Sequence, residues 1–161
     1  MSHNKVYRAN LQINPASAFD YDDIDPPERD GYFHQIEQIS VASSSNDTAN
    51  YQVSLGTSIA VPVRSSFVIT TDALANDLLT LTSLNCTSDG TIVREVTRDV
   101  IGDRESYVDE LLLFQDTLRV FAAVPTNVAA GKTLFLAVLV RIAEVKITSD
   151  TQQHLLNKMY S

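Results

Sequence analysis

The feature that most constrains this chain is an alternation of apolar and polar residues, which begins near His34 and recurs almost to the C-terminus. Residues 51–55, for example, read Tyr-Gln-Val-Ser-Leu. A period of two places successive side chains on opposite faces of a β-strand, so runs of this kind predict strands with one face buried. Further strands are predicted at residues 59–63, 66–71, 78–84, 91–97, 111–114, 117–124 and 133–147.

Turn-forming segments separate these runs, as at 43–47 (Ser-Ser-Ser-Asn-Asp) and 88–90 (Ser-Asp-Gly). Short strands with turns every ten residues or so predict an all-β, antiparallel fold, a β-sandwich of jelly-roll type. A chain of 161 residues is the size of one domain and buries enough surface to fold without disulfides. Residues 72–79 are open to a second interpretation as a short helix.

The last run, residues 133–147, is apolar on both faces near its middle. The even positions from Leu134 to Ile142 form one row, and the odd positions from Phe135 to Leu139 form the other. Two apolar faces are typical of a central strand in its own sandwich, or of a strand whose outer face is covered by another subunit. The sequence leaves both interpretations open.

Residues 1–31 differ from the rest and are predicted to be an extended acidic arm. Six acidic residues surround Pro26-Pro27 between residues 20 and 30, and charge repulsion with fixed proline dihedrals favours an extended path. The globular domain is then expected over residues 32–148. The few apolar side chains of the arm are expected to anchor on a neighbouring surface, and they are Val6, Leu11, Ile13, Phe19 and Tyr21.

Residues 149–161 form the C-terminal tail, for which a short helix is predicted. Ser149 stands three residues before Gln152, the spacing of a capping box. So short a helix is marginally stable alone and needs a surface on which to dock. Its apolar stripe, a second set of candidate partner contacts, is Leu155, Leu156 and Met159.

The charge of the chain excludes whole classes of partner. Twelve basic residues against twenty acidic ones give a net charge of −8, which repels phosphate backbones and anionic lipid. The longest apolar run falls short of the ~20 residues that span a bilayer, and the polar N-terminus lacks the apolar core of a secretory signal. We therefore expect no nucleic-acid or membrane partner and synthesis in the cytoplasm.

Motifs that would carry chemistry fail on inspection. Gly131-Lys132-Thr133 resembles the end of a phosphate-binding loop, but Thr126 stands where the first glycine belongs, and a strand rather than a helix follows. The acidic segment does not fit an EF-hand loop, because a loop that starts at Asp20 has Ile24 at its fifth position and Asp25 instead of glycine at its sixth. The three histidines and the single Cys86 are too dispersed for a local metal or nucleophile motif. No catalytic, cofactor or metal site is predicted, and the chain is not expected to be an enzyme.

A small acidic β-sandwich with extended ends and an unusually apolar last strand is similar in kind to the coat, cement and decoration proteins of viruses, bacteriophages above all. The resemblance covers the architecture of residues 34–147 and the two ends. It implies a non-enzymatic virion structural protein at the capsid surface. It also implies homo-oligomerisation, often as a trimer, with termini that reach adjacent capsid subunits through many weak contacts.

The alternative function is a carbohydrate- or receptor-binding β-sandwich module. Such a module is expected to gather Tyr, Asn and Asp side chains in a concave cluster on one sheet face or at one loop end. Binding of a sugar by the isolated protein favours this alternative, whereas concentration-dependent association favours the structural protein.

Overall fold

The computed structural model describes residues 5–14, 18–45, 50–59, 65–67, 72, 77–88, 92–100, 113–124 and 133–160. Within them the chain forms nine strands and the C-terminal helix α2. The elements are β1 (Lys5–Ile13), β2 (Phe19–Ile24), β3 (Tyr32–Ser45), β4 (Asn50–Ile59), β5 (Leu78–Ser88), β6 (Ile92–Val100), β7 (Leu113–Phe114), β8 (Leu118–Ala123), β9 (Leu134–Lys146) and α2 (Ser149–Tyr160).

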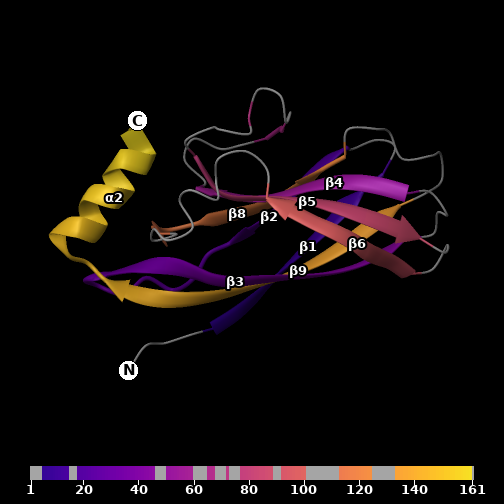
Figure 1. Ribbon diagram of the computed structural model, residues 1–161. Coiled ribbons are helices and arrows are strands. Elements are labelled where there is room, and N and C mark those ends of the chain that lie inside the picture. Colours follow the sequence, from indigo (N-terminus) through magenta and orange to yellow (C-terminus); the bar gives the residue numbers. More distant parts are fainter. Residues whose placement is uncertain are drawn as a thin grey trace.

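The strands form a two-layered antiparallel β-sandwich, as the alternation predicted (Figure 1). One layer contains β1, β9, β3 and β7, and the other contains β2, β8, β4 and β5. Strand β6 links the layers, because it pairs along its length with β5 and with only Ser43 and Ser44 of β3. Hydrogen bonding therefore runs from one layer into the other along a single side of the sandwich.

Strand β9 is the centre of its layer, flanked by β1 and β3 over most of its length. Its even-numbered row from Leu134 to Ile142 is buried in the core, opposite Leu118, Val120 and Ala122 of β8. The odd-numbered row points away from the core. Of the two interpretations of this strand, the structure combines parts of both, since β9 is central within its layer and yet has an outer face that its own sandwich leaves uncovered.

The N-terminal arm is the main correction to the sequence analysis. Residues 5–13 pair antiparallel with β9, and residues 19–24 pair antiparallel with β8, so both segments are strands of the sandwich. Leu11 and Ile13 are 2% and 0% exposed and belong to the main core. The prediction of an arm was wrong because a strand with one buried face needs an apolar residue only at every second position. The many charged residues of this segment made that sparse apolar pattern hard to recognise.

Acidic residues of β2 accept hydrogen bonds from the backbone of β1, at the side of the sandwich where these two edge strands lie. The backbone N–H of Asn10 donates to Asp22 Oδ2 at 2.9 Å, and that of Gln12 donates to Asp20 Oδ2 at 2.7 Å. These donors lie on the edge of β1 that does not pair with β9. Carboxylates thus satisfy the backbone groups that an edge strand would otherwise offer to a foreign strand.

A second, smaller core lies on the outer face of the β2–β8–β4–β5 layer. Phe121 occupies its centre, with the rings of Phe19 and Phe67 at centroid distances of 5.7 and 5.2 Å. Gly56 of β4 makes room for it, since a Cβ atom there would lie 2.4 Å from Phe121 Cζ. One aromatic side chain thus covers a glycine on the neighbouring strand and joins β2 to the segment around residue 67.

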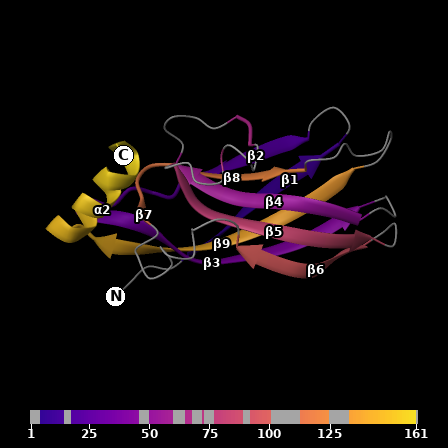
Figure 2. The same ribbon diagram turned by 45° about the horizontal axis from the view of Figure 1, so that its top comes forward.

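Helix α2 stands at one end of the sandwich, where it contacts β7 (Figures 1 and 2). Its capping box is made by Thr148 and Thr151 rather than by Ser149 and Gln152. The Thr151 N–H donates to Thr148 Oγ1 at 3.2 Å, and the Thr148 N–H donates to Thr151 Oγ1 at 2.7 Å. The predicted helical tail is therefore confirmed with its start shifted by one residue. Helix α2 is too short and too polar to cross a membrane.

The middle of the chain holds the remaining differences. Ser66 and Phe67 are not in a strand, in contrast to the strand predicted over 66–71, and residues 68–71 lie outside the described part of the chain. Residues 60–63 of the predicted strand 59–63 lie outside it as well. Leu78 and Leu79 begin β5, so they do not belong to the helix considered for residues 72–79.

Candidate functional site

The structure separates the side chains that were predicted to anchor on a partner. Leu11 and Ile13 are inside the core, and Phe19 packs against Phe121, so these three hold the chain's own fold together. Val6 and Leu156 are 56% and 40% exposed and remain accessible. The side chains of Leu155 and Met159 lie outside the described part of the structure.

Tyr21 is 44% exposed, but one face of its ring is already covered. The guanidinium of Arg119 lies 3.7 Å from the ring centroid and forms a bidentate pair with Asp23, at 2.8 Å from Nε to Oδ1 and 2.9 Å from Nη2 to Oδ2. The hydrogen bonds to Asp23 raise the pKa of Arg119 further above its ordinary value. The group is a local brace between β2 and β8 that keeps a buried cation paired.

A continuous uncovered surface is formed by the outward side chains of β1 and β9, which we call the β1–β9 outer face. Because the two strands pair in register from Lys5–Ile142 to Ile13–Leu134, their outward residues lie side by side. No outward residue of these two strands is acidic, although the chain carries −8 overall. The face consists of Val6, Arg8, Asn10 and Gln12 from β1, and Phe135, Ala137, Leu139 and Arg141 from β9.

The β1–β9 outer face has a raised part and a hollow next to it. Phe135 and Leu139 are 47% and 42% exposed, which is unusual for large apolar side chains at the centre of a sheet. Beside Phe135 is a hollow of about 330 Å³, lined by Asn10, Ala42 and Ala137 among others. Arg8 donates from Nε to Asn10 Oδ1 at 2.8 Å and is held within the sheet face. This surface can bury apolar area without burying a carboxylate.

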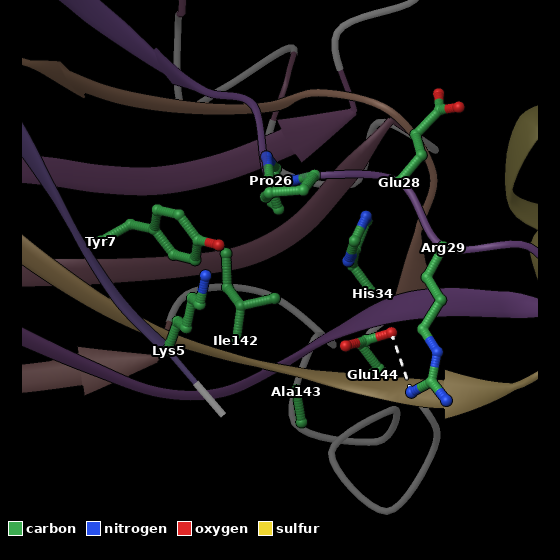
Figure 3. Close-up of a pocket in the computed structure, with 10 residues that line it drawn as sticks. Lys5, Tyr7, Pro26, Glu28, Arg29, His34, Ile142, Ala143 and Glu144 are labelled. Atoms are coloured by element: carbon green, nitrogen blue, oxygen red, sulfur yellow. Dashed lines mark hydrogen bonds and ion pairs between the residues drawn. The ribbon is translucent and has the colours of Figure 1, made fainter. Parts of the chain in front are cut away.

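A second concave region lies where the core ends between the two layers, and we call it the His34 cavity (Figure 3). Toward this end the inward rows change from apolar to polar: His34 on β3 pairs in register with Glu144 on β9 and with Phe114 on β7. The segment from Pro26 to Arg29 covers them. The cavity measures about 290 Å³, and its remaining lining includes Lys5, Tyr7 and Ile142.

Acidic groups act on both His34 and Tyr7 inside the His34 cavity. Burial lowers the pKa of His34, while Glu144, Asp116 and Asp25 oppose this shift. Burial and then Glu144 raise the pKa of Tyr7, so its hydroxyl stays protonated. At the mouth, a hydrogen bond to Asp116 and that group's charge raise the pKa of Glu28. At neutral pH the cavity therefore offers a neutral imidazole and a phenol beneath a crowd of carboxyl groups.

Two cations approach the cavity from its rim. Arg29 Nη1 lies 3.4 Å from Glu144 Oε2, and its guanidinium lies 4.0 Å from the centroid of the Tyr32 ring. Lys5 reaches the opposite end, beside Tyr7 (Figure 3). Within the described residues no group of three or more His, Cys, Asp or Glu side chains is placed to hold a metal ion. The arrangement is suited to hydrogen bonding rather than to metal coordination.

The sequence analysis missed both surfaces for the same reason. His34 and Glu144 are far apart in the chain, and only their cross-strand register brings them together. The row of Phe135, Ala137 and Leu139 was recognised, but its neighbours on β1 were assigned to an arm.

In comparisons with known proteins, no protein-family model matches this sequence, and no curated protein matches it either.

Proposed function

We propose that this protein is a non-enzymatic structural protein that works by assembling with copies of itself through the β1–β9 outer face. The observation that carries the proposal is the exposure of Phe135 and Leu139 at the centre of a sheet face that is free of outward carboxylates on β1 and β9. Its setting, following the resemblance of the sequence, is the surface of a virus capsid, where such an assembly cements or decorates the shell.

The composition of the face favours a second copy as its partner. Phe135 is exposed beside a hollow whose lining includes Ala42 and Ala137, so the ring of one copy can enter the hollow of another in a symmetric contact. The outward carboxylates that would repel an equally acidic copy are absent from β1 and β9. Burial of this apolar area is the driving force, and the polar rim of Arg8, Asn10 and Gln12 supplies hydrogen bonds.

The carbohydrate- or receptor-binding alternative has less support. It requires several Tyr, Asn and Asp side chains that converge in one concavity. The His34 cavity has one tyrosine, Tyr7, and is lined otherwise by charged groups, His34, prolines and aliphatic side chains. The hollow beside Phe135 is lined mainly by apolar side chains, with Asn10 and Arg8 as its polar groups.

Sedimentation velocity of single variants tests the proposal. Phe135→Asp and Leu139→Asp each place a carboxylate in the β1–β9 outer face, and we expect each to turn an associating protein into a monomer. Both side chains point away from the core, so circular dichroism and the melting transition should stay those of the wild type.

Leu156→Asp is the matched control, since Leu156 is 40% exposed on α2, away from the face. We expect this variant to associate as the wild type does. Dissociation by Leu156→Asp together with normal association of Phe135→Asp would move the contact to the C-terminal helix and contradict the proposal.

A further inference from the structure

His34 is the starting point, because it is a largely buried polar side chain that lines a cavity. The residue is 5% exposed, and its side chain forms part of the cavity wall. Its ring instead packs on Phe114, at a centroid distance of 5.2 Å. Polar groups of a largely buried side chain are nearly always hydrogen-bonded, so the imidazole depends for its hydrogen bonds on what occupies the cavity that it lines. Figure 3 places the ring between the Pro26–Arg29 segment and Glu144.

The charges around the ring indicate the sign of the missing group. Glu144, Asp116 and Asp25 all act on His34 as negative charges. At the mouth, a side-chain hydrogen bond to Asp116 and the charge of that group raise the pKa of Glu28, as expected where carboxyl groups crowd together. Lys5 and Arg29 line the same cavity, but the charges that act on the imidazole itself are all negative. A cation is therefore favoured beside the ring, and an anion is disfavoured.

The neutral state of the imidazole determines which kind of hydrogen bond it makes. Burial keeps His34 unprotonated at neutral pH, so one ring nitrogen is an acceptor. Glu144, whose side chain is 17% exposed, provides a second acceptor on the neighbouring strand. Two acceptors side by side match a group with several N–H donors, such as an ammonium.

The chain's own Arg29 supports this assignment. It reaches Glu144 from the solvent side at 3.4 Å, through one nitrogen, and its side chain is 45% exposed. An ion pair that is this long and this exposed contributes little free energy. A bound cation can therefore readily replace Arg29 at Glu144. The cavity volume of about 290 Å³ is near the lower end of ordinary ligand sites, and Pro26, Ile142 and the Tyr7 ring form an apolar wall. A short aliphatic stem fits against this wall.

We propose that the His34 cavity binds an organic cation, a primary ammonium group on a short aliphatic stem, with His34 and Glu144 as its acceptors. The site is separate from the β1–β9 outer face, because His34 and Glu144 lie on the inner side of the layer. The proposal therefore stands or fails independently of self-association. The ammonium comes from a free small amine or from a lysine side chain of another protein, and the chemistry is the same in both.

Nuclear magnetic resonance of the full chain tests the site with n-butylammonium as the probe. At pH 7.5 and constant ionic strength, we expect saturable shifts of the His34 ring signals and of the Glu144 amide. n-Butanol has the same stem without the charge, and butyrate has the opposite charge, so neither should produce saturable shifts. Saturation by butyrate or equal effects of butanol would overturn the proposal, as would no saturable response to the amine at millimolar concentrations.

Variants identify the acceptors. Glu144→Gln removes the charge and keeps the shape, and we expect it to weaken n-butylammonium binding by about tenfold or more, the usual effect of losing a charge-assisted hydrogen bond. His34→Phe keeps the ring stacking on Phe114 and should abolish binding; if it does not fold, His34→Leu replaces it. Asp150→Asn, an equal loss of charge on α2, is the matched control and should bind like the wild type. Wild-type affinity in Glu144→Gln would contradict the assignment.

Binding of a lysine side chain is then distinguished from binding of a free amine. Addition of N-acetyl-lysine amide, which presents the same ammonium on a peptide-like backbone, should give shifts at the same signals. Tighter binding of this compound than of n-butylammonium indicates a protein partner, and weaker binding indicates a free amine.

Discussion

Gly56 lies against the Phe121 ring, and this contact makes the position sensitive to the addition of a single methyl group. A Cβ atom would lie 2.4 Å from Cζ and 2.9 Å from Cε1 of a ring that also packs against Phe19 and Phe67. We predict that Gly56→Ala lowers the free energy of unfolding by about 1–3 kcal/mol, the usual cost of overpacking. Urea denaturation measures it.

The double variant Gly56→Ala with Phe121→Leu isolates the cause. If the clash with the ring is responsible, the double variant loses less stability than the sum of the two single variants. Additive losses would show that the cost of Gly56→Ala has another origin.

His34 gives the protein a pH dependence of stability whose sign follows from its environment. Burial lowers its pKa in the folded state below the ordinary value, so the unfolded chain binds more protons in that range. The contribution of neutral His34 to the free energy of unfolding is fully present above about pH 6.5, the ordinary pKa of histidine. This contribution is lost as the pH falls through the lowered pKa of the folded state. We predict that His34→Phe reduces this loss, as measured by urea denaturation at pH 5 and pH 7.5. An unchanged difference between the two pH values would contradict the prediction.

At the scale of elements, β1 is the strand on which the sequence analysis and the structure differ most. Its inward row consists of Lys5, Tyr7, Ala9, Leu11 and Ile13. Only the last two are large aliphatic residues, and local density of such residues is what identifies a strand in a sequence. By contrast, β8 and β9 were predictable, because long runs of Leu, Val and Phe leave little other choice.

Leu11 and Val6 provide a direct comparison on this strand. Leu11 is 2% exposed and Val6 is 56% exposed. We predict that Leu11→Ala lowers the free energy of unfolding by about 2–5 kcal/mol, because it opens a cavity in the core. Val6→Ala should change it by no more than about 0.5 kcal/mol. Equal, small effects at both positions would restore the interpretation of residues 1–31 as an arm.

The hydrogen bonds between backbone amides of β1 and carboxylates of β2 can be tested separately. Asp22 accepts from the amide of Asn10, and Asp20 accepts from that of Gln12. We predict that Asp22→Ala speeds hydrogen exchange of the Asn10 amide and leaves Gln12 nearly unchanged, and that Asp20→Ala does the reverse. Asp22→Asn keeps an acceptor oxygen and should lie between wild type and Asp22→Ala. Equal acceleration of exchange at both amides in either alanine variant would contradict the prediction, because it would show that β1 and β2 separate together.

For the whole molecule, the sequence was sufficient to predict the class of fold and the unusual character of the last strand. It was not sufficient for the candidate sites, since both depend on register between distant segments: β1 against β9 for the outer face, and His34 against Glu144 for the cavity. The acidic segment illustrates the difficulty. Its charges suggested solvent exposure, but Asp20, Asp22 and Asp23 bind the backbone of β1 and the side chain of Arg119.

The molecule as a whole is acidic, and the surface proposed for its assembly is not. Two copies with a net charge of −8 repel each other over a distance that salt shortens, while apolar burial between them is not weakened by salt. Self-association through the β1–β9 outer face is therefore expected to strengthen with ionic strength. An interface held by pairs between opposite charges would weaken.

The most direct test is the molar mass of the wild-type protein, measured by equilibrium sedimentation over a range of concentrations at low and at high salt. We predict a mass that rises with concentration from that of a monomer, and an association that is tighter at high salt. A protein that remains monomeric under every condition, or that dissociates as salt is added, would contradict assembly through this face.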